Sequence, residues 1–248
     1  LGAEKFLDIK CRSAELKPSA VVIVTTVRAL KMHGGVEQDA LDEENIEAML
    51  KGTENLAKHI ESIKAFNLPY IVAVNKFAKD TPKEVETLLY WCKENDHPVS
   101  EADGWANGGN GMIDLANAIV EITEKENDFR FIYDEKESIE EKIEKISKII
   151  YGAKGVEYTD LAKEKIQNFI ENGWDKLPVC MAKTPLSLSD DLKLKGRPAD
   201  FNIHVQDISI SAGAGFVVVY TGNILTMPGL PKAPAAINMG VDEKGNTY

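Results

Sequence analysis

The stretch YIVAVNKFAKDTPKE, residues 70–84, passes from strand to loop to helix and decides the fold class. It begins with a short apolar run, which is typical of a strand buried on both faces of a sheet. Thr81, Pro82 and Glu84 then supply an N-cap, a proline at the first helical position and an acidic residue at the third. The stretch therefore predicts a buried strand over 70–74, a polar loop, and a helix that begins at Pro82.

The same alternation of strand and helix continues on both sides of this stretch. AVVIVTTV (20–27) is a second apolar run rich in β-branched residues, and residues 42–66 place apolar side chains on one helical face. A short strand near 97–101 and a helix over 112–125 follow. This order is the rhythm of a parallel, doubly wound sheet. We therefore expect an α/β fold over residues 1–178.

The last third of the chain has a different pattern. Ser138 and Thr159 are predicted to cap two charged amphipathic helices. After these helices, alternating runs appear, such as FNIHVQDISI (201–210) and FVVVYTGNIL (216–225), separated by glycine and proline. We expect residues 179–248 to form a small, mostly β C-terminal domain.

Composition and charge limit the classes of partner. A net charge of -11 argues against nucleic acid or an anionic membrane surface as a partner. No apolar run approaches the roughly 20 residues that a transmembrane helix needs, and no signal peptide is visible. The cysteines and histidines are scattered without metal-ligand or disulfide spacing, so no metal site is expected. These features favour a cytoplasmic protein.

Polar and aromatic side chains follow each predicted strand. Open α/β sheets bind ligands at the carboxyl ends of their strands, so these side chains are candidates for a binding site. Residues 1–35 also hold more basic than acidic side chains, which favours a bound anion there, although ordinary solvated charges remain an alternative. The candidates are Arg28, Lys31 and His33 after the first strand, Asn75, Lys76 and Phe77 after the second, and Trp105 after the third.

The Asn-Lys pair at 75–76 resembles the strand end with which guanine-reading NTPases hold the base. The aspartate that such proteins place next but one is Ala78 here. The order of strands, helices and loops resembles the base-binding half of a P-loop NTPase, but the phosphate-binding motif G-x-x-x-x-G-K-[ST] does not occur in these residues. Either the protein is not an NTPase, or its phosphate-binding loop precedes Leu1.

Two aromatic residues stand in polar loops. Phe77 follows the Asn-Lys pair, and Trp105 lies within DGWANGGNG (103–111). An aromatic ring in such a setting is often an exposed stacking surface, and two of them on adjacent loops would enclose a flat heterocycle. The alternative is that each ring packs beneath its own loop.

Two segments near the C-terminus are rich in glycine and proline. Gly213 and Gly215 of SAGAGF (211–216) would allow the backbone to approach a nucleotide, although a β-bulge explains them equally well. TMPGLPKAPAA (226–236) has a proline at every third position, which favours an extended polyproline-like segment, most simply a surface strap.

Together these motifs resemble formate–tetrahydrofolate ligase, also called 10-formyltetrahydrofolate synthetase. The resemblance extends over essentially the whole chain, and LGAEKFLDIKCR (1–12) is similar to a segment that lies well inside the family's sequence. It implies that these residues are the C-terminal part of a subunit whose N-terminal part is missing here. The motifs are KPSAVVIVTTVRALKMHGG (17–35), NKFAKDT (75–81), LPVCMAKT (177–184), SAGAGF (211–216) and TMPGLPKAPAA (226–236).

The resemblance implies an ATP-dependent ligase that joins formate to tetrahydrofolate through formyl phosphate. The products would be 10-formyltetrahydrofolate, ADP and phosphate. ATP with Mg²⁺ and tetrahydrofolate would be its substrates, a monovalent cation is compatible with it, and the complete subunit would form a tetramer. The catalytic residues and the phosphate-binding loop would lie in the missing N-terminal part. The isolated chain is therefore expected to be inactive.

The resemblance also assigns a role to the two aromatic candidates. Phe77 and Trp105 match the two family aromatics that are taken to enclose the pterin ring. Asn75, Lys76, Arg28, Lys31, His33, Gly213 and Gly215 are the candidates for nucleotide binding.

The tryptophan loop departs from the family's common W-A-K-G-G-E-G-G, because it has Asn107, Asn110 and Met112 in place of lysine, glutamate and glycine. This departure favours an alternative, a non-catalytic folate- or partner-binding module of the same fold. An unrelated P-loop regulatory ATPase is a third reading.

Overall fold

The structure is a computed structural model that describes residues 2–222, 224 and 233–247. Most of the TMPGLPKAPAA segment, residues 226–232, lies outside the described residues, and so does the polyproline-like run predicted there. In the part of the chain that the structure describes, no helix has both the length and the apolarity that crossing a membrane requires.

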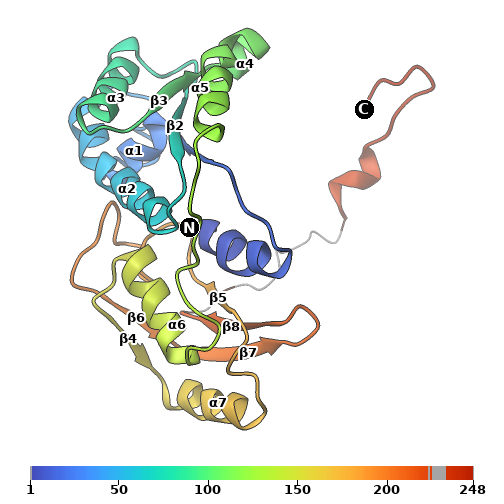
Figure 1. The fold of residues 1–248 in the computed structure, drawn as a ribbon. Coiled ribbons are helices and arrows are strands. Elements are labelled where there is room, and N and C mark those ends of the chain that lie inside the picture. Colours follow the sequence, from blue (N-terminus) through green and yellow to red (C-terminus); the bar gives the residue numbers. More distant parts are fainter. Residues whose placement is uncertain (1, 223, 225–232, 248) are drawn as a thin grey trace.

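Helices and strands alternate along most of the chain (Figure 1). The strands are β1 (Val21–Thr25), β2 (Tyr70–Asn75), β3 (Val99–Ala102), β4 (Gly155–Tyr158), β5 (Val179–Ala182), β6 (Asn202–Val205), β7 (Asp207–Ser211) and β8 (Phe216–Tyr220). The α-helices are α1 (Val27–His33), α2 (Ile46–Ala65), α3 (Pro82–Glu94), α4 (Gly104–Asn107), α5 (Ile113–Thr123), α6 (Ile139–Lys145) and α7 (Asp160–Glu171). Two π-helical segments, η1 (Lys5–Cys11) and η3 (Ile146–Tyr151), and two 3₁₀ turns, η2 (Gly108–Met112) and η4 (Ala235–Asn238), complete them.

The first sheet consists of β1, β2 and β3, in that order and all parallel. Its central strand β2 is buried on both faces: Val72 and Val74 share a core with Leu88 of α3, whereas Ile71 and Ala73 pack with α5. Figure 1 shows α2 and α3 on one side of β2 and α5 on the other. A parallel sheet between helices agrees with the predicted α/β class. Its likeness to a P-loop NTPase sheet stays a prediction.

The helix starts follow from local sequence. Thr26 accepts a hydrogen bond from the Ala29 N–H at 3.0 Å and thereby begins α1 directly after β1. Thr81 accepts one from the Glu84 N–H at 3.2 Å, and the Glu84 carboxylate accepts one from the Thr81 N–H at 3.1 Å. This reciprocal pair confirms the capping box predicted for α3.

Helices α1 and α2 cross with their backbones in contact. A Cβ atom on Gly34 would lie 1.8 Å from the Ala48 carbonyl oxygen, and one on Gly52 would lie 1.9 Å from the Leu30 carbonyl oxygen. Only glycine therefore fits at these two positions. The close crossing brings together the two ends of the loop that joins the helices, residues 35–45.

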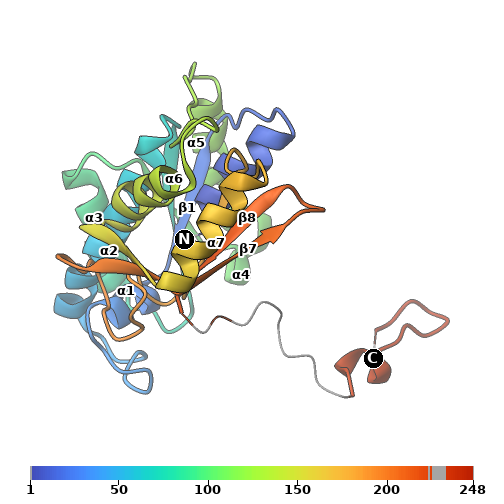
Figure 2. The ribbon, with the colours of Figure 1, turned by 90° about the horizontal axis from the view of Figure 1, so that it is seen from below.

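The second part of the molecule contains two smaller sheets. Strands β5, β8 and β7 form one, in which β5 and β8 are parallel and β7 and β8 antiparallel. Strands β4 and β6 form a parallel pair. Helix α6 packs against β4 and β5, and α7 packs against β4 and β7 (Figures 1 and 2).

Strand pairing in this part of the molecule crosses the predicted domain boundary, and the division into two domains stays a prediction. Strand β4 precedes the boundary predicted at residue 178 and β6 follows it, yet the two are paired. The alternating run predicted over 201–210 is divided at Gln206, whose N–H donates to the Tyr220 carbonyl oxygen at 2.8 Å. Its two halves, β6 and β7, join different sheets. The strand-rich segment and the helices before it therefore share one core.

Candidate functional site

The start of α1, the loop between α1 and α2, the loop after β2 and helix α4 surround a pocket at the carboxyl edge of the first sheet. Its volume is about 390 Å³, within the range of small-molecule sites, and its lining is mostly apolar. Phe77 and Trp105 both line it, so the structure brings the two predicted aromatic residues to one place. The complete lining is Thr26, Arg28, Leu41, Asp42, Phe77, Ala78, Lys79, Asp80 and Trp105.

The two aromatic rings are available to a ligand. Phe77 is 48% exposed and Trp105 is 79% exposed, so neither packs beneath its own loop. Large exposed apolar side chains that gather at one pocket are a common mark of a binding site. Their proposed contact with a pterin ring stays a prediction.

Local hydrogen bonds hold both aromatic loops. The Phe77 N–H donates to the Asp80 carboxylate at 2.9 Å, and the Asp80 N–H donates to the Phe77 carbonyl oxygen at 3.0 Å. Partial burial raises the pKa of Asp80 above its usual value. In the tryptophan loop, the Asn107 amide donates to the Asp103 carboxylate at 2.9 Å. Asn107 therefore braces its own loop.

The charges at the pocket neutralise one another. Asp42 pairs with both Arg28 and Lys79, and all three side chains are exposed. The hydrogen bonds from Lys79 and Arg28 hold the pKa of Asp42 below its usual value. An incoming anion would therefore compete with a carboxylate that is already in place.

Asn75 and Lys76 lie at the end of β2 beside this pocket and are not part of its lining. The Lys76 ammonium is 2.9 Å from Glu101 and 3.7 Å from Asp103. The hydrogen bond with Glu101 raises the pKa of Lys76. Both partners come from β3 and the loop after it, so the lysine links neighbouring strand ends.

Two of the three basic residues predicted after the first strand are not in the lining of this pocket, and their role in nucleotide binding stays a prediction. Lys31 is 1% exposed and forms an ion pair with Glu84 at 2.9 Å. His33 accepts a hydrogen bond from the Gly196 N–H at 3.2 Å, and burial together with Lys195 lowers its pKa. His33 lines a different pocket, of about 380 Å³.

Gly213 and Gly215 also lie apart from the other nucleotide candidates. They form the hairpin turn between β7 and β8, which Figure 1 shows at the opposite end of the molecule from α4. Gly215 has φ +72°, and its N–H donates to the Ser211 carbonyl oxygen at 2.9 Å. The turn geometry accounts for Gly215, and a role of the two glycines in nucleotide binding stays a prediction.

Comparison with known proteins gives the family. A family model for formate–tetrahydrofolate ligase matches residues 1–248. The chain belongs to this family. It is 53% identical over 247 residues to the formate–tetrahydrofolate ligase of Bacillus pumilus and 54% identical over 246 residues to that of Bacillus licheniformis. Each alignment covers 99% of this chain and 44% of the relative, so the chain spans less than half the length of these curated relatives.

Sequence reasoning missed part of the pocket in this member of the formate–tetrahydrofolate ligase family. Leu41 and Asp42 come from the loop between α1 and α2, which holds no recognisable motif. The signal that could have found them is the pair Gly34 and Gly52, which lets the helices cross closely. In residues 2–222, 224 and 233–247, no group of three or more His, Cys, Asp or Glu side chains is arranged to hold a metal ion.

Proposed function

We propose that this chain is the pterin-binding part of a formate–tetrahydrofolate ligase. In this proposal the pterin ring of tetrahydrofolate lies between Phe77 and Trp105. The observation that carries the proposal is that two exposed aromatic side chains, on segments following adjacent parallel strands, line one apolar pocket. A flat, polar-edged heterocycle is the ligand class that such a pair of rings accommodates best.

The energetics support a stacking role. Each aromatic contact contributes about 1 kcal/mol beyond the burial of apolar area, and stacking of nucleic-acid bases on aromatic side chains contributes about 1–3 kcal/mol per base. Leu41 and Ala78 complete the apolar lining. Since transfer of a formyl group to an amine depends mainly on placement, a rigid pterin pocket would contribute by orienting the acceptor.

The full reaction that we propose joins formate to tetrahydrofolate with ATP through formyl phosphate. The cations near the pocket do not fit the triphosphate of ATP, because each is engaged within the chain: Lys31 with Glu84, Lys76 with Glu101, and Arg28 with Asp42. We therefore assign phosphate and Mg²⁺ binding, and the activation of formate, to the part of the longer relatives that this chain does not span.

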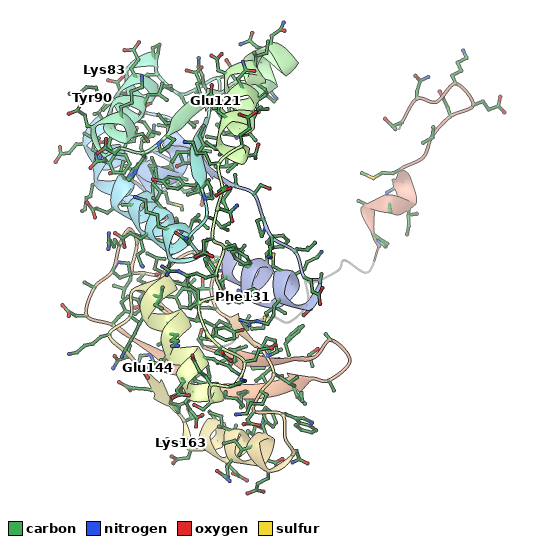
Figure 3. All side chains as sticks on the ribbon, viewed as in Figure 1. Lys83, Tyr90, Glu121, Phe131, Glu144 and Lys163 are labelled. Carbon is green, nitrogen blue, oxygen red and sulfur yellow. The ribbon has the colours of Figure 1, made fainter. Side chains whose placement is uncertain are left out.

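Calorimetric titration with tetrahydrofolate under reducing conditions tests the pterin pocket. Phe77→Ala and Trp105→Ala are each expected to weaken binding about tenfold or more, since each removes one stacked face. Tyr90→Ala is the matched control, because Tyr90 is also an exposed aromatic residue, at 63%, but lies on α3 outside the pocket (Figure 3). Equal affinity in all four proteins, or no binding by the parent, would overturn the assignment.

A second measurement tests whether formate activation requires the part of the longer relatives that this chain does not span. We expect the 248-residue chain, given ATP, formate and tetrahydrofolate, to release no phosphate above the rate of the buffer. Turnover by this chain alone would mean that the activation step does not need the rest of the subunit.

A further inference from the structure

We propose that the buried ion pair between Lys31 and Glu84 is a positioning pair, which holds the pocket loops so that Phe77 faces a bound pterin. The inference rests on the proposed function for its ligand. It assigns to two residues outside the pocket a role in setting the pocket's shape.

The pair lies in the interior. The Lys31 ammonium is 2.9 Å from the Glu84 carboxylate, and their side chains are 2% and 0% exposed. Neither residue lines the pocket. Burying two charges costs several kcal/mol per ion unless every donor and acceptor is satisfied. The surroundings of this pair meet that condition through backbone groups.

One set of hydrogen bonds leads to the loop between α1 and α2. The Lys31 ammonium donates to the Glu43 carbonyl oxygen at 2.8 Å, and the Asn45 N–H donates to the Glu84 carboxylate at 3.0 Å. This loop carries Leu41 and Asp42 into the pocket. The ion pair therefore tethers the loop from two directions, close to the residues that line the site.

The other set leads to the phenylalanine loop. The second oxygen of Glu84 accepts a hydrogen bond from the Thr81 N–H at 3.1 Å. Thr81 directly follows the turn in which the Asp80 carboxylate accepts a hydrogen bond from the Phe77 N–H at 2.9 Å. One carboxylate thus joins the start of α3, and through it the Phe77 turn, to the loop that carries Leu41.

A charged pair can hold the two pocket loops through hydrogen bonds, whereas an apolar pair cannot. Two apolar side chains could fill the same volume, but the N–H groups of Asn45 and Thr81 and the carbonyl of Glu43 would lose their partners. Burial alone would raise the pKa of Glu84, yet the hydrogen bonds from Asn45, Lys31 and Thr81 hold it below its usual value. The carboxylate therefore stays ionised and keeps accepting hydrogen bonds at neutral pH.

A second buried lysine provides the matched control. Lys142 is 0% exposed, and its ammonium donates to the carbonyl oxygens of Asp175 and Leu177 at 2.9 and 3.1 Å. It belongs to α6, in the other part of the molecule (Figure 1). Lys142→Met removes a buried ammonium without touching the pocket loops.

The experiment compares Lys31→Met, the double variant Lys31→Met/Glu84→Met and Lys142→Met. Tetrahydrofolate affinity is measured by calorimetry, hydrogen exchange of the Phe77 amide by NMR, and the unfolding midpoint in urea. The double variant avoids an isolated buried charge and is expected to fold. We expect it to bind tetrahydrofolate about tenfold more weakly or worse, because small displacements of positioning groups have large effects. Its Phe77 amide should also exchange faster.

The control separates positioning from stability. Lys142→Met should lower the unfolding midpoint while leaving affinity and Phe77 exchange as in the parent. The proposal is overturned if the double variant keeps parental Phe77 exchange, or if Lys142→Met changes exchange equally. Should neither Lys31 variant fold, Glu84→Gln decides the question, since it keeps the size of the side chain and one acceptor oxygen.

The two proposals can fail separately. If Phe77→Ala binds tetrahydrofolate as well as the parent, the pterin assignment fails, while the exchange of the Phe77 amide still reports whether the ion pair holds its loop.

Discussion

The loops around the pocket and the region around η1 contain buried charges in two different arrangements. Beside the pocket, Lys31 and Glu84 neutralise each other and are hydrogen-bonded to backbone groups. Around η1, Glu4 and Asp8 are almost completely buried, and one oxygen of each has no hydrogen-bond partner in the described part of the chain. Lys183, in the same region, donates to three backbone carbonyl oxygens.

This difference indicates which part of the molecule responds to pH. Hydrogen bonds keep the pKa of Glu84 low despite its burial. Around η1, burial raises the pKa of Asp8 to about 7 and lowers the pKa of Lys183 to about 8. The Glu84 carboxylate beside the pocket is therefore ionised at neutral pH, whereas Asp8 and Lys183 around η1 change protonation near it.

The largest loss of stability is expected when one partner of the Lys31–Glu84 ion pair is removed. Lys31→Met leaves the Glu84 carboxylate buried and uncompensated, so the free energy of unfolding should fall by about 3–5 kcal/mol. Urea denaturation measures it. A loss below 1 kcal/mol would mean that the pair is not the buried, mutually dependent unit described above.

The next largest effect is a pH dependence of the free energy of unfolding, which comes from Asp8. In the unfolded chain its carboxyl loses the proton near pH 4, whereas the folded protein keeps the proton up to about pH 7. Between these values the folded state binds more protons, so stability falls as pH rises, by about 2–4 kcal/mol from this group.

Asp8→Asn tests this origin. An asparagine can still accept the hydrogen bond that the Ile132 N–H donates to Asp8 at 2.9 Å, but it does not titrate. The free energy of unfolding, measured by urea denaturation at several pH values, should therefore decline less between about pH 4 and 7 in the variant. Parallel curves for the parent and the variant would show that another group is responsible.

A smaller effect is expected from Lys183, which forms no ion pair with a carboxylate among the described residues. Lys183→Met removes donors from the carbonyl oxygens of Thr184, Ser187 and Ser189 but leaves no buried charge behind. The expected destabilisation is about 1–3 kcal/mol. Comparing this value with that of Lys31→Met by the same denaturation method measures directly how much an ionic partner matters. Equal losses would remove the distinction between the two regions.

The smallest loss of stability is expected from a substitution that affects only the backbone conformation. Gly215→Ala places a side chain at φ +72° in the hairpin turn, with open space around its Cβ, and should cost about 1 kcal/mol. Because the turn lies far from the pocket, tetrahydrofolate affinity should stay unchanged. Thermal unfolding tests the expected change in stability, and calorimetry tests the affinity. Weakened binding would indicate that Gly215 contributes to the ligand site.

Features that depend on a few neighbouring residues could be predicted from the sequence. The β-branched runs and helical periodicities predict the alternation of elements, and Thr81 with Glu84 predicts the start of α3. Phe77 and Trp105 were identifiable because each follows a strand within a polar loop, where a core role is unusual. The structure finds both exposed at one pocket. Their contact with a pterin is for binding measurements to establish.

Features that join residues distant in the sequence could not be predicted from it and are visible only in the tertiary structure. A lysine on an amphipathic helix has the same local sequence whether it meets water or a buried carboxylate, so the burial of Lys31 against Glu84 had no signal of its own. The same holds for the pairing of β4 with β6, which crosses the predicted boundary, and for the hairpin that removes Gly215 from the pocket. Local propensity is set by contacts along the chain, whereas charge pairing and sheet order are set by which surfaces the folded core brings together.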